Sequence, residues 1–335
     1  MHGRVASGGA RGVCRRLGAR RVRALAATAA AALLLARGEG AAAVAAPGEG
    51  TRLAFAATIA PVAAIVREVA GRRAEVRTLL PPGVSPHTYE PKPSDLRAAS
   101  AARAVFYAQD ALDGWAVDLP QLARIELFSF VPPQLRLAMP EGHAHGHRHA
   151  SGVHSHAEGT EAGAGADGHF WTSPLTVRAV LPELAETLSR LDPAGAAEYR
   201  TNARRFDAEL RALHRELSAL LQPYAGEHLL LLHPSLQYFL RDYGLELAAA
   251  VEPAPGKEPS PRYVVELVKL VRRLKVKAVF AEPQLPPRIV RVLAEETGLP
   301  VYELDPLGGI PGRRTYSELL RYNAHTVARA LGPRG

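Results

Sequence analysis

One apolar stripe between Pro193 and Leu221 constrains the fold of this chain more than any other feature. Apolar side chains recur in it at alternating intervals of four and three, the spacing of one face of an α-helix. The positions are Tyr199, Ala203, Phe206, Leu210, Leu213, Leu217 and Leu220. No glycine lies between Gly195 and Leu221, and Asp192 before Pro193 is a typical helix N-cap. At 1.5 Å per residue this helix is roughly 40 Å long, so we expect residues 192–222 to form a rigid linker helix.

Short apolar runs alternate with helical patterns on both sides of this helix, which indicates α/β domains with mainly parallel sheets. In residues 46–191 we expect strands at Leu53–Thr58, Glu75–Leu80 and Ala104–Ala108, and helices at Pro61–Ala70, Ser94–Ala102 (capped by Ser94) and from Pro174 (capped by Ser173). In residues 223–335 we expect strands at His228–Leu232, Val276–Ala281 and Val301–Leu304, and helices at Pro234–Tyr243, Arg262–Leu274, Pro287–Thr297 and Tyr316–Leu331. The sequence therefore predicts two α/β lobes joined by a single long helix.

The N-terminal 45 residues have the pattern of a secretory signal peptide. Eight arginines and one acidic residue fall in residues 1–40, and an apolar run, Ala24–Ala36, precedes small residues that offer cleavage sites. Residues 1–40 carry +7 of the formal net charge of +8, so the exported chain is near +1 and lacks the basic surface of a nucleic-acid-binding protein. Because Cys14 lies within the signal peptide, a metal site in the exported protein must use nitrogen and oxygen donors.

A histidine tract interrupts the first lobe, in a loop expected over residues 141–168. It contains His143, His145, His147, His149, His154 and His156, separated by small and polar residues. A segment with so little apolar surface is expected to stay mobile, and clustered imidazoles collect zinc and similar metals. An inert solvated insertion is the alternative interpretation.

Three isolated histidines and one aspartate stand at the ends of expected elements. His87 follows the strand Glu75–Leu80, His169 follows the histidine-rich loop, His233 ends an apolar run, and Asp305 follows the last strand. Loops beyond the carboxyl ends of parallel strands line ligand crevices, and a set of three nitrogens and one oxygen suits zinc. Taken singly, each is more often a packed or turn residue than a ligand.

The segments around these residues form an ordered series of motifs. They are PPGVSPHTYEPKPSDL (81–96), DGHFWTSP (167–174), LLHPSLQYFLRDYGLE (231–246), GKEPSPR (256–262), FAEPQ (280–284), LDPLG (304–308) and YSELLRYNAHTVARAL (316–331). In this order and spacing the chain resembles the cluster A-I (zinc/manganese) solute-binding proteins of bacterial metal ABC transporters. The resemblance covers residues 52–331, and the family also carries a histidine-rich insertion at this point.

The resemblance implies two α/β lobes joined by one rigid helix, with a metal bound between the lobes. The family's ligands correspond to His87, His169, His233 and Asp305. Manganese-binding members have glutamate at the position of His233, so three histidines favour zinc. Two departures concern the surroundings of the ligands: Gly168 replaces a proline, and HPSLQYF lacks the carboxylate that usually follows the histidine. Glu282 belongs to a family motif and is expected to be structural.

The resemblance thus predicts a periplasmic, monomeric zinc-binding protein that captures Zn²⁺ and delivers it to the permease and ATPase of an ABC transporter in the inner membrane. No enzymatic activity is expected. The tract histidines are expected to be an accessory, low-affinity metal collector. The alternatives are a protein for manganese or another divalent metal, a metal-dependent adhesin and, less favoured, a secreted zinc hydrolase. The sequence has no HExxH or HxxEH motif to support the hydrolase.

Overall fold

The computed structural model describes residues 52–118, 122–140, 165–252 and 257–332. These residues belong to one unit of the chain, Glu49–Gly335. The predicted signal peptide and the six histidines of the tract, His143, His145, His147, His149, His154 and His156, lie outside the described ranges. No helix in those ranges has the length and apolar character needed to cross a membrane.

The first sheet has four parallel strands in the order β2-β1-β3-β4. The elements of this lobe are β1 (Leu53–Ala57), α1 (Ala60–Ala70), β2 (Ala74–Thr78), α2 (Pro93–Ser100), β3 (Ala104–Tyr107), α3 (Asp110–Asp113) and β4 (Ala123–Glu126). The central strand β3 is buried along its whole length, as expected for a parallel strand covered on both faces.

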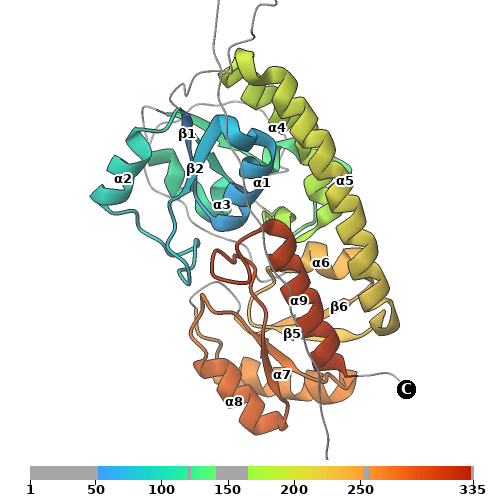
Figure 1. Ribbon diagram of the computed structural model, residues 1–335. Coiled ribbons are helices and arrows are strands. Elements are labelled where there is room, and N and C mark those ends of the chain that lie inside the picture. The colour runs from blue at the N-terminus through green and yellow to red at the C-terminus, as the bar shows by residue number, and fades with distance from the viewer. Residues whose placement is uncertain (1–51, 119–121, 141–164, 253–256, 333–335) are drawn as a thin grey trace, which may run out of the picture. The chain divides into compact units, whose positions relative to one another are not determined.

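The second sheet repeats this arrangement, with four parallel strands in the order β6-β5-β7-β8. Its lobe contains β5 (His228–Leu231), α6 (Gln237–Asp242), β6 (Glu246–Ala250), α7 (Pro261–Leu274), β7 (Val279–Ala281), α8 (Arg288–Thr297), β8 (Val301–Glu303) and α9 (Tyr316–Leu331). The prediction of two similar α/β lobes with parallel sheets is confirmed (Figure 1).

Two long helices, α4 (Pro174–Leu191) and α5 (Ala196–Leu221), follow the first lobe. Ser173 caps α4 as predicted, because its Oγ accepts a hydrogen bond from the backbone N–H of Thr176 at 2.9 Å. The apolar stripe of α5 is buried except at Leu220, which is partly buried. It packs on α1 and α4 and on α9 of the second lobe (Figure 1). The prediction of one long helix joining two lobes is therefore confirmed.

Two predicted helix caps are wrong. The helix α5 begins only after a 3₁₀ turn, Pro193–Gly195, and the carboxylate of Asp192 instead accepts hydrogen bonds from Arg73 and Tyr199. Ser94 lies inside α2, whose first turn is held by Asp95 accepting from the backbone N–H of Lys92 at 2.8 Å. Asp192 thus pairs with side chains instead of capping α5, and Asp95 instead of Ser94 closes the first turn of α2.

Hydrogen bonds from buried aromatic side chains connect the lobes. The hydroxyl of Tyr238 on α6 accepts from the backbone N–H of Leu137 at 3.0 Å and donates to the carbonyl of Asp167 at 2.8 Å. The indole N–H of Trp171 donates to the carbonyl of Pro306 at 2.8 Å. Each of these bonds satisfies a buried or partly buried polar group. The lobes are therefore linked by side-chain-to-backbone hydrogen bonds as well as by α5.

We predict that Tyr238→Phe lowers the free energy of unfolding by about 1–3 kcal/mol, because it leaves the Leu137 N–H and the Asp167 carbonyl without this partner. Tyr243→Phe is the matched control, since the buried Tyr243 hydroxyl has no hydrogen-bond partner among the described residues. The control is expected to be neutral or stabilising. Urea unfolding of the metal-free proteins measures both, and equal losses in the two variants would contradict the prediction.

Candidate metal centre

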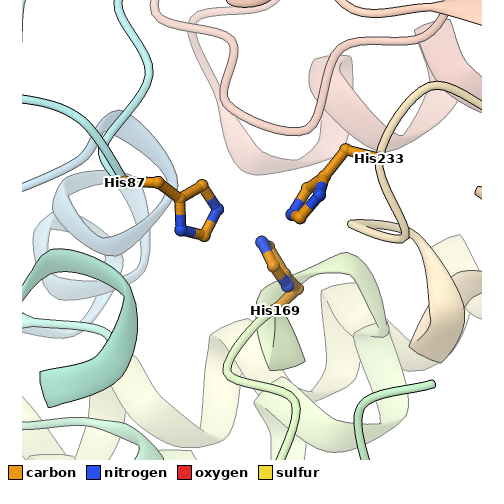
Figure 2. Close-up of side chains that lie close together, drawn as sticks. All are labelled: His87, His169 and His233. Atoms are coloured by element: carbon orange, nitrogen blue, oxygen red, sulfur yellow. The ribbon is translucent and has the colours of Figure 1, made fainter. Parts of the chain in front are cut away.

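Three buried or partly buried histidines converge from three segments that lie far apart in the sequence. His87 lies in the turn after β2, His169 immediately precedes the 3₁₀ turn Phe170–Thr172 that leads into α4, and His233 lies two residues beyond β5. Figure 2 shows the three imidazole rings directed toward one another. Two of the histidines thus follow parallel strands, at the edge where such sheets bind ligands.

The rings are close enough for one ion to contact all three. Ring centroids are 5.4 Å apart for His87 and His169, 4.9 Å for His87 and His233, and 5.2 Å for His169 and His233. One nitrogen from each residue lies within 4.8 Å of the other two. His169 and His233 are each 2% exposed, and His87 is partly exposed. The structure therefore brings together three of the four predicted ligands, and their binding of a metal stays a prediction.

The orientation of His169 is set by Asp167, a residue for which the sequence predicts no role. Asp167 Oδ1 lies 2.7 Å from Nδ1 of His169 and also accepts the backbone N–H of His169 at 2.9 Å. Its Oδ2 accepts from Nε2 of Gln237 at 2.8 Å. Because a carboxylate oxygen accepts, this contact favours the tautomer with the proton on Nδ1, in which Nε2 is the nitrogen suited to bind a metal. The position of Asp167 two residues before a candidate ligand is the signal that could have identified it.

Gly168 stands where the family pattern has proline, and the position of the Gln109 side chain explains this departure. A Cβ at position 168 would lie 2.3 Å from Oε1 of Gln109 and 3.0 Å from its Cβ. Gln109 is 5% exposed, and its Nε2 donates a long hydrogen bond of 3.4 Å to the carbonyl of Ala166. The side chain of Gln109 therefore occupies the volume that a proline ring at position 168 would fill.

All four strands of the second sheet are followed within two residues by a histidine or an acidic residue. They are His233 after β5, Glu252 after β6, Glu282 after β7 and Asp305 after β8, each at most 7% exposed. Glu282 lines the same pocket as the three histidines and accepts a hydrogen bond from Ser235 Oγ at 2.6 Å. Burial, with the nearby carboxylates of Asp305 and Glu252, raises the pKa of Glu282 to about 8.

Asp305 is not part of the histidine group. Its carboxylate contacts Gln284, Arg313 and two backbone N–H groups. The pocket is lined by its neighbours Gln284, Pro306 and Leu307. Ligation by Asp305 therefore stays a prediction, and so does metal binding by the tract histidines, which lie outside the described residues.

Three converging imidazoles, in two α/β lobes with parallel sheets joined by one long helix, are the arrangement expected of a metal-binding receptor. Neutral imidazole is a good ligand for zinc, and three such donors leave at least one coordination position for water or an oxygen ligand. Residues 56–330 match the family model described as zinc-uptake complex component A, periplasmic (ZnuA). The chain belongs to this family.

Known relatives agree with this assignment. The high-affinity zinc uptake system protein ZnuA of Brucella abortus is 28% identical over 310 residues, which cover 84% of this chain and 92% of that protein. Zinc-binding protein AdcA of Streptococcus pyogenes is 26% identical over 279 residues, covering 81% of this chain. The matched part is 54% of AdcA, so this chain spans about half the length of that relative. A crystal structure of ZnuA, 28% identical, superposes with a TM-score of 0.72 over 84% of this chain and 100% of the other.

We predict that Glu282→Gln stabilises the metal-free protein at alkaline pH. The pKa of Glu282 is raised to about 8 from an ordinary value of 4.5. The folded state therefore keeps a proton that the unfolded state releases, and the free energy of unfolding falls as pH rises through this interval. Glutamine preserves the hydrogen-bonding shape without the charge. We expect the variant to exceed the wild type by roughly 2–4 kcal/mol near pH 9, with the difference vanishing toward pH 4.

Urea unfolding in the presence of a chelator, at several pH values, measures this difference. A constant offset between variant and wild type across the whole range would contradict the assigned cause.

Proposed function

We propose that this protein is a periplasmic zinc receptor that captures Zn²⁺ and delivers it to the permease and ATPase of an ABC transporter. The convergence of His87, His169 and His233 on one point carries this proposal. The family's description as a periplasmic component of zinc-uptake complexes supports the compartment and the partner. We further propose that the receptor is monomeric and does not bind nucleic acid.

Capture of zinc requires only ligand exchange at these residues. The imidazoles must be unprotonated to bind, so binding releases protons and weakens as the solution is acidified toward the ordinary pKa of imidazole. Hydrogen bonding of Asp167 to His169 orients that ring before the ion arrives, and such outer contacts typically contribute about 10–100-fold to metal affinity. Three nitrogen donors favour zinc over manganese, which prefers oxygen.

The same three donors would also suit a secreted zinc hydrolase, because catalytic zinc sites use three protein ligands and an open position. We infer that the site has no catalytic role, because the family is described by uptake and the sequence has no zinc-protease motif. We expect the zinc-bound protein to show no activity in esterase and peptidase assays.

We predict one tight zinc site per chain, which depends on the three histidines. Substituting His87, His169 or His233 by alanine removes one of three donors and is expected to weaken binding by about 100-fold or more. His325→Ala is the matched control, since this histidine is exposed on α9. Deleting residues 143–156 is expected to leave the tight site intact. Competition with a chromophoric zinc chelator measures each affinity, and a panel of Zn²⁺ and Mn²⁺ measures selectivity.

Loss of tight binding in the deletion, with retention in His87→Ala, would instead make the tract the principal site. That result would favour a storage or adhesin role over the receptor proposed here.

A further inference from the structure

Gln109 is anchored at the carboxyl edge of the first sheet, two residues beyond β3. The buried carboxylate of Asp113 accepts the backbone N–H groups of Ala108 and Gln109, each at 2.9 Å. The same carboxylate accepts a hydrogen bond from Oγ1 of Thr58, which directly follows β1. Because these buried polar groups satisfy one another, the backbone that carries the Gln109 side chain is fixed to the ends of two strands.

The side chain of Gln109 lies against the segment that leads into His169. A Cβ at position 168 would meet Gln109 first, since the three atoms nearest to it all belong to that side chain. Nε2 of Gln109 donates a long hydrogen bond to the carbonyl of Ala166, at 3.4 Å. Oε1 is buried and has no hydrogen-bond partner among the described residues. Gln109 therefore restrains Gly168 by its volume more than by hydrogen bonding.

The glycine at position 168 is required by space and not by its own backbone conformation. Gly168 is not one of the described residues with positive φ, so its backbone does not itself demand glycine. A proline here would fix φ near −65° and hold the preceding residue in an extended conformation. Glycine imposes neither restraint and leaves the chain its greatest freedom. The course of the chain into His169 must therefore be fixed by neighbouring groups.

Backbone hydrogen bonds restrain the residues just before Gly168. The N–H of Asp167 donates to the carbonyl of Leu137 at 2.8 Å, and Ala166 pairs with Ala138 in an antiparallel bridge. Gly168 connects these paired residues to His169, whose ring is directed toward the other two imidazoles in Figure 2. A shift of the chain at Gly168 would thus move His169 relative to its partners at the candidate site.

We propose that Gln109 is a positioning residue for the metal centre. Its side chain fills the space beside Gly168 and fixes the course of the chain into His169, a restraint that a proline ring at position 168 would otherwise supply. The glutamine and a proline cannot both occupy this volume, so each can replace the other. This inference rests on the proposed function, because it concerns how one ligand of the same zinc site is held in place.

A double-substitution cycle with Gln109→Gly and Gly168→Pro tests this proposal, using zinc affinities of the full exported chain measured by chelator competition. Gln109→Met keeps a side chain of similar length but removes both polar atoms. Leu112→Ala is the matched control for lost volume, because Leu112 is buried in the adjoining helix α3 and is not among the nearest neighbours of position 168. Thermal unfolding of each metal-free variant is the second readout. Gly168→Ala replaces Gly168→Pro if the proline variant does not fold, with a smaller effect in the same direction.

We expect Gln109→Gly and Gly168→Pro each to weaken zinc binding by about tenfold or more, because the first removes the restraint and the second forces the chain away from Gln109. The double variant is expected to return to within about threefold of wild type, since the proline ring then occupies the vacated space. Gln109→Met is expected to stay within about threefold, with an unfolding midpoint no lower than that of the wild type, because it leaves no buried oxygen unpaired. Leu112→Ala is expected to lower the midpoint while changing the affinity by less than about twofold.

Wild-type zinc affinity in Gln109→Gly, or a double variant no tighter than the weaker single variant, would overturn the proposal. An equal loss of affinity in Gln109→Met and Gln109→Gly would also overturn it, because the hydrogen bond and not the volume of the side chain would then be responsible. A wild-type protein with no histidine-dependent zinc site would instead overturn the proposed function, and this inference with it.

Discussion

Parallel strand pairing is the constraint on which the rest of the molecule depends. Every strand in a parallel sheet runs the same way, so consecutive strands must be joined by crossovers and all carboxyl ends lie at one edge. The chain obeys this twice, with the same strand order in both lobes. His87 after β2 and His233 after β5 are brought to such edges by topology alone. The third histidine, His169, comes from the segment entering α4, so the site combines two sheet edges with one helix start.

The contacts that link the lobes also build the site. Tyr238 donates its hydroxyl proton to the carbonyl of Asp167, and Gln237, the preceding residue, donates to the carboxylate of Asp167. Two consecutive residues at the start of α6 in the second lobe thus hold the residue that orients His169. A change in how α6 meets the segment before α4 would therefore alter the orientation of His169 as well. The same few hydrogen bonds thus link the two lobes and fix the orientation of His169.

Features with strong periodicity could be predicted from the sequence. The stripe of α5 and the full extent of α9, Tyr316–Leu331, follow from helical spacing that tertiary contacts reinforce. Strands β4 and β6 are not predicted, because they are sheet edges with sequences ARIE and ELAAA, which are either charged or rich in alanine. The expected cap Asp192 fails because Arg73, distant in sequence, reaches its carboxylate. The spacing of residues along the sequence cannot reveal a hydrogen-bond partner that is so distant in the chain.

The candidate site, like the fold, could be predicted from the sequence only in part. His87, His169 and His233 are recognisable because each ends an element within a family motif, and the structure brings them together. The arrangement around them depends on pairs that no local pattern connects, such as Gln109 with Gly168 and Arg313 with Asp305.

A transport receptor must both hold its ion and release it, and this requirement bears on the charge around the pocket. Three neutral imidazoles leave the bound ion its full double charge in a buried position, where desolvation is costly. A carboxylate ligand would offset that cost and deepen binding, but it would also slow release. In this chain Asp167 orients His169, Arg313 pairs with Asp305, and Glu282 accepts a hydrogen bond from Ser235. A cation at the proposed site would therefore meet three imidazole nitrogens, with the side chain of Glu282 at the wall of the same pocket.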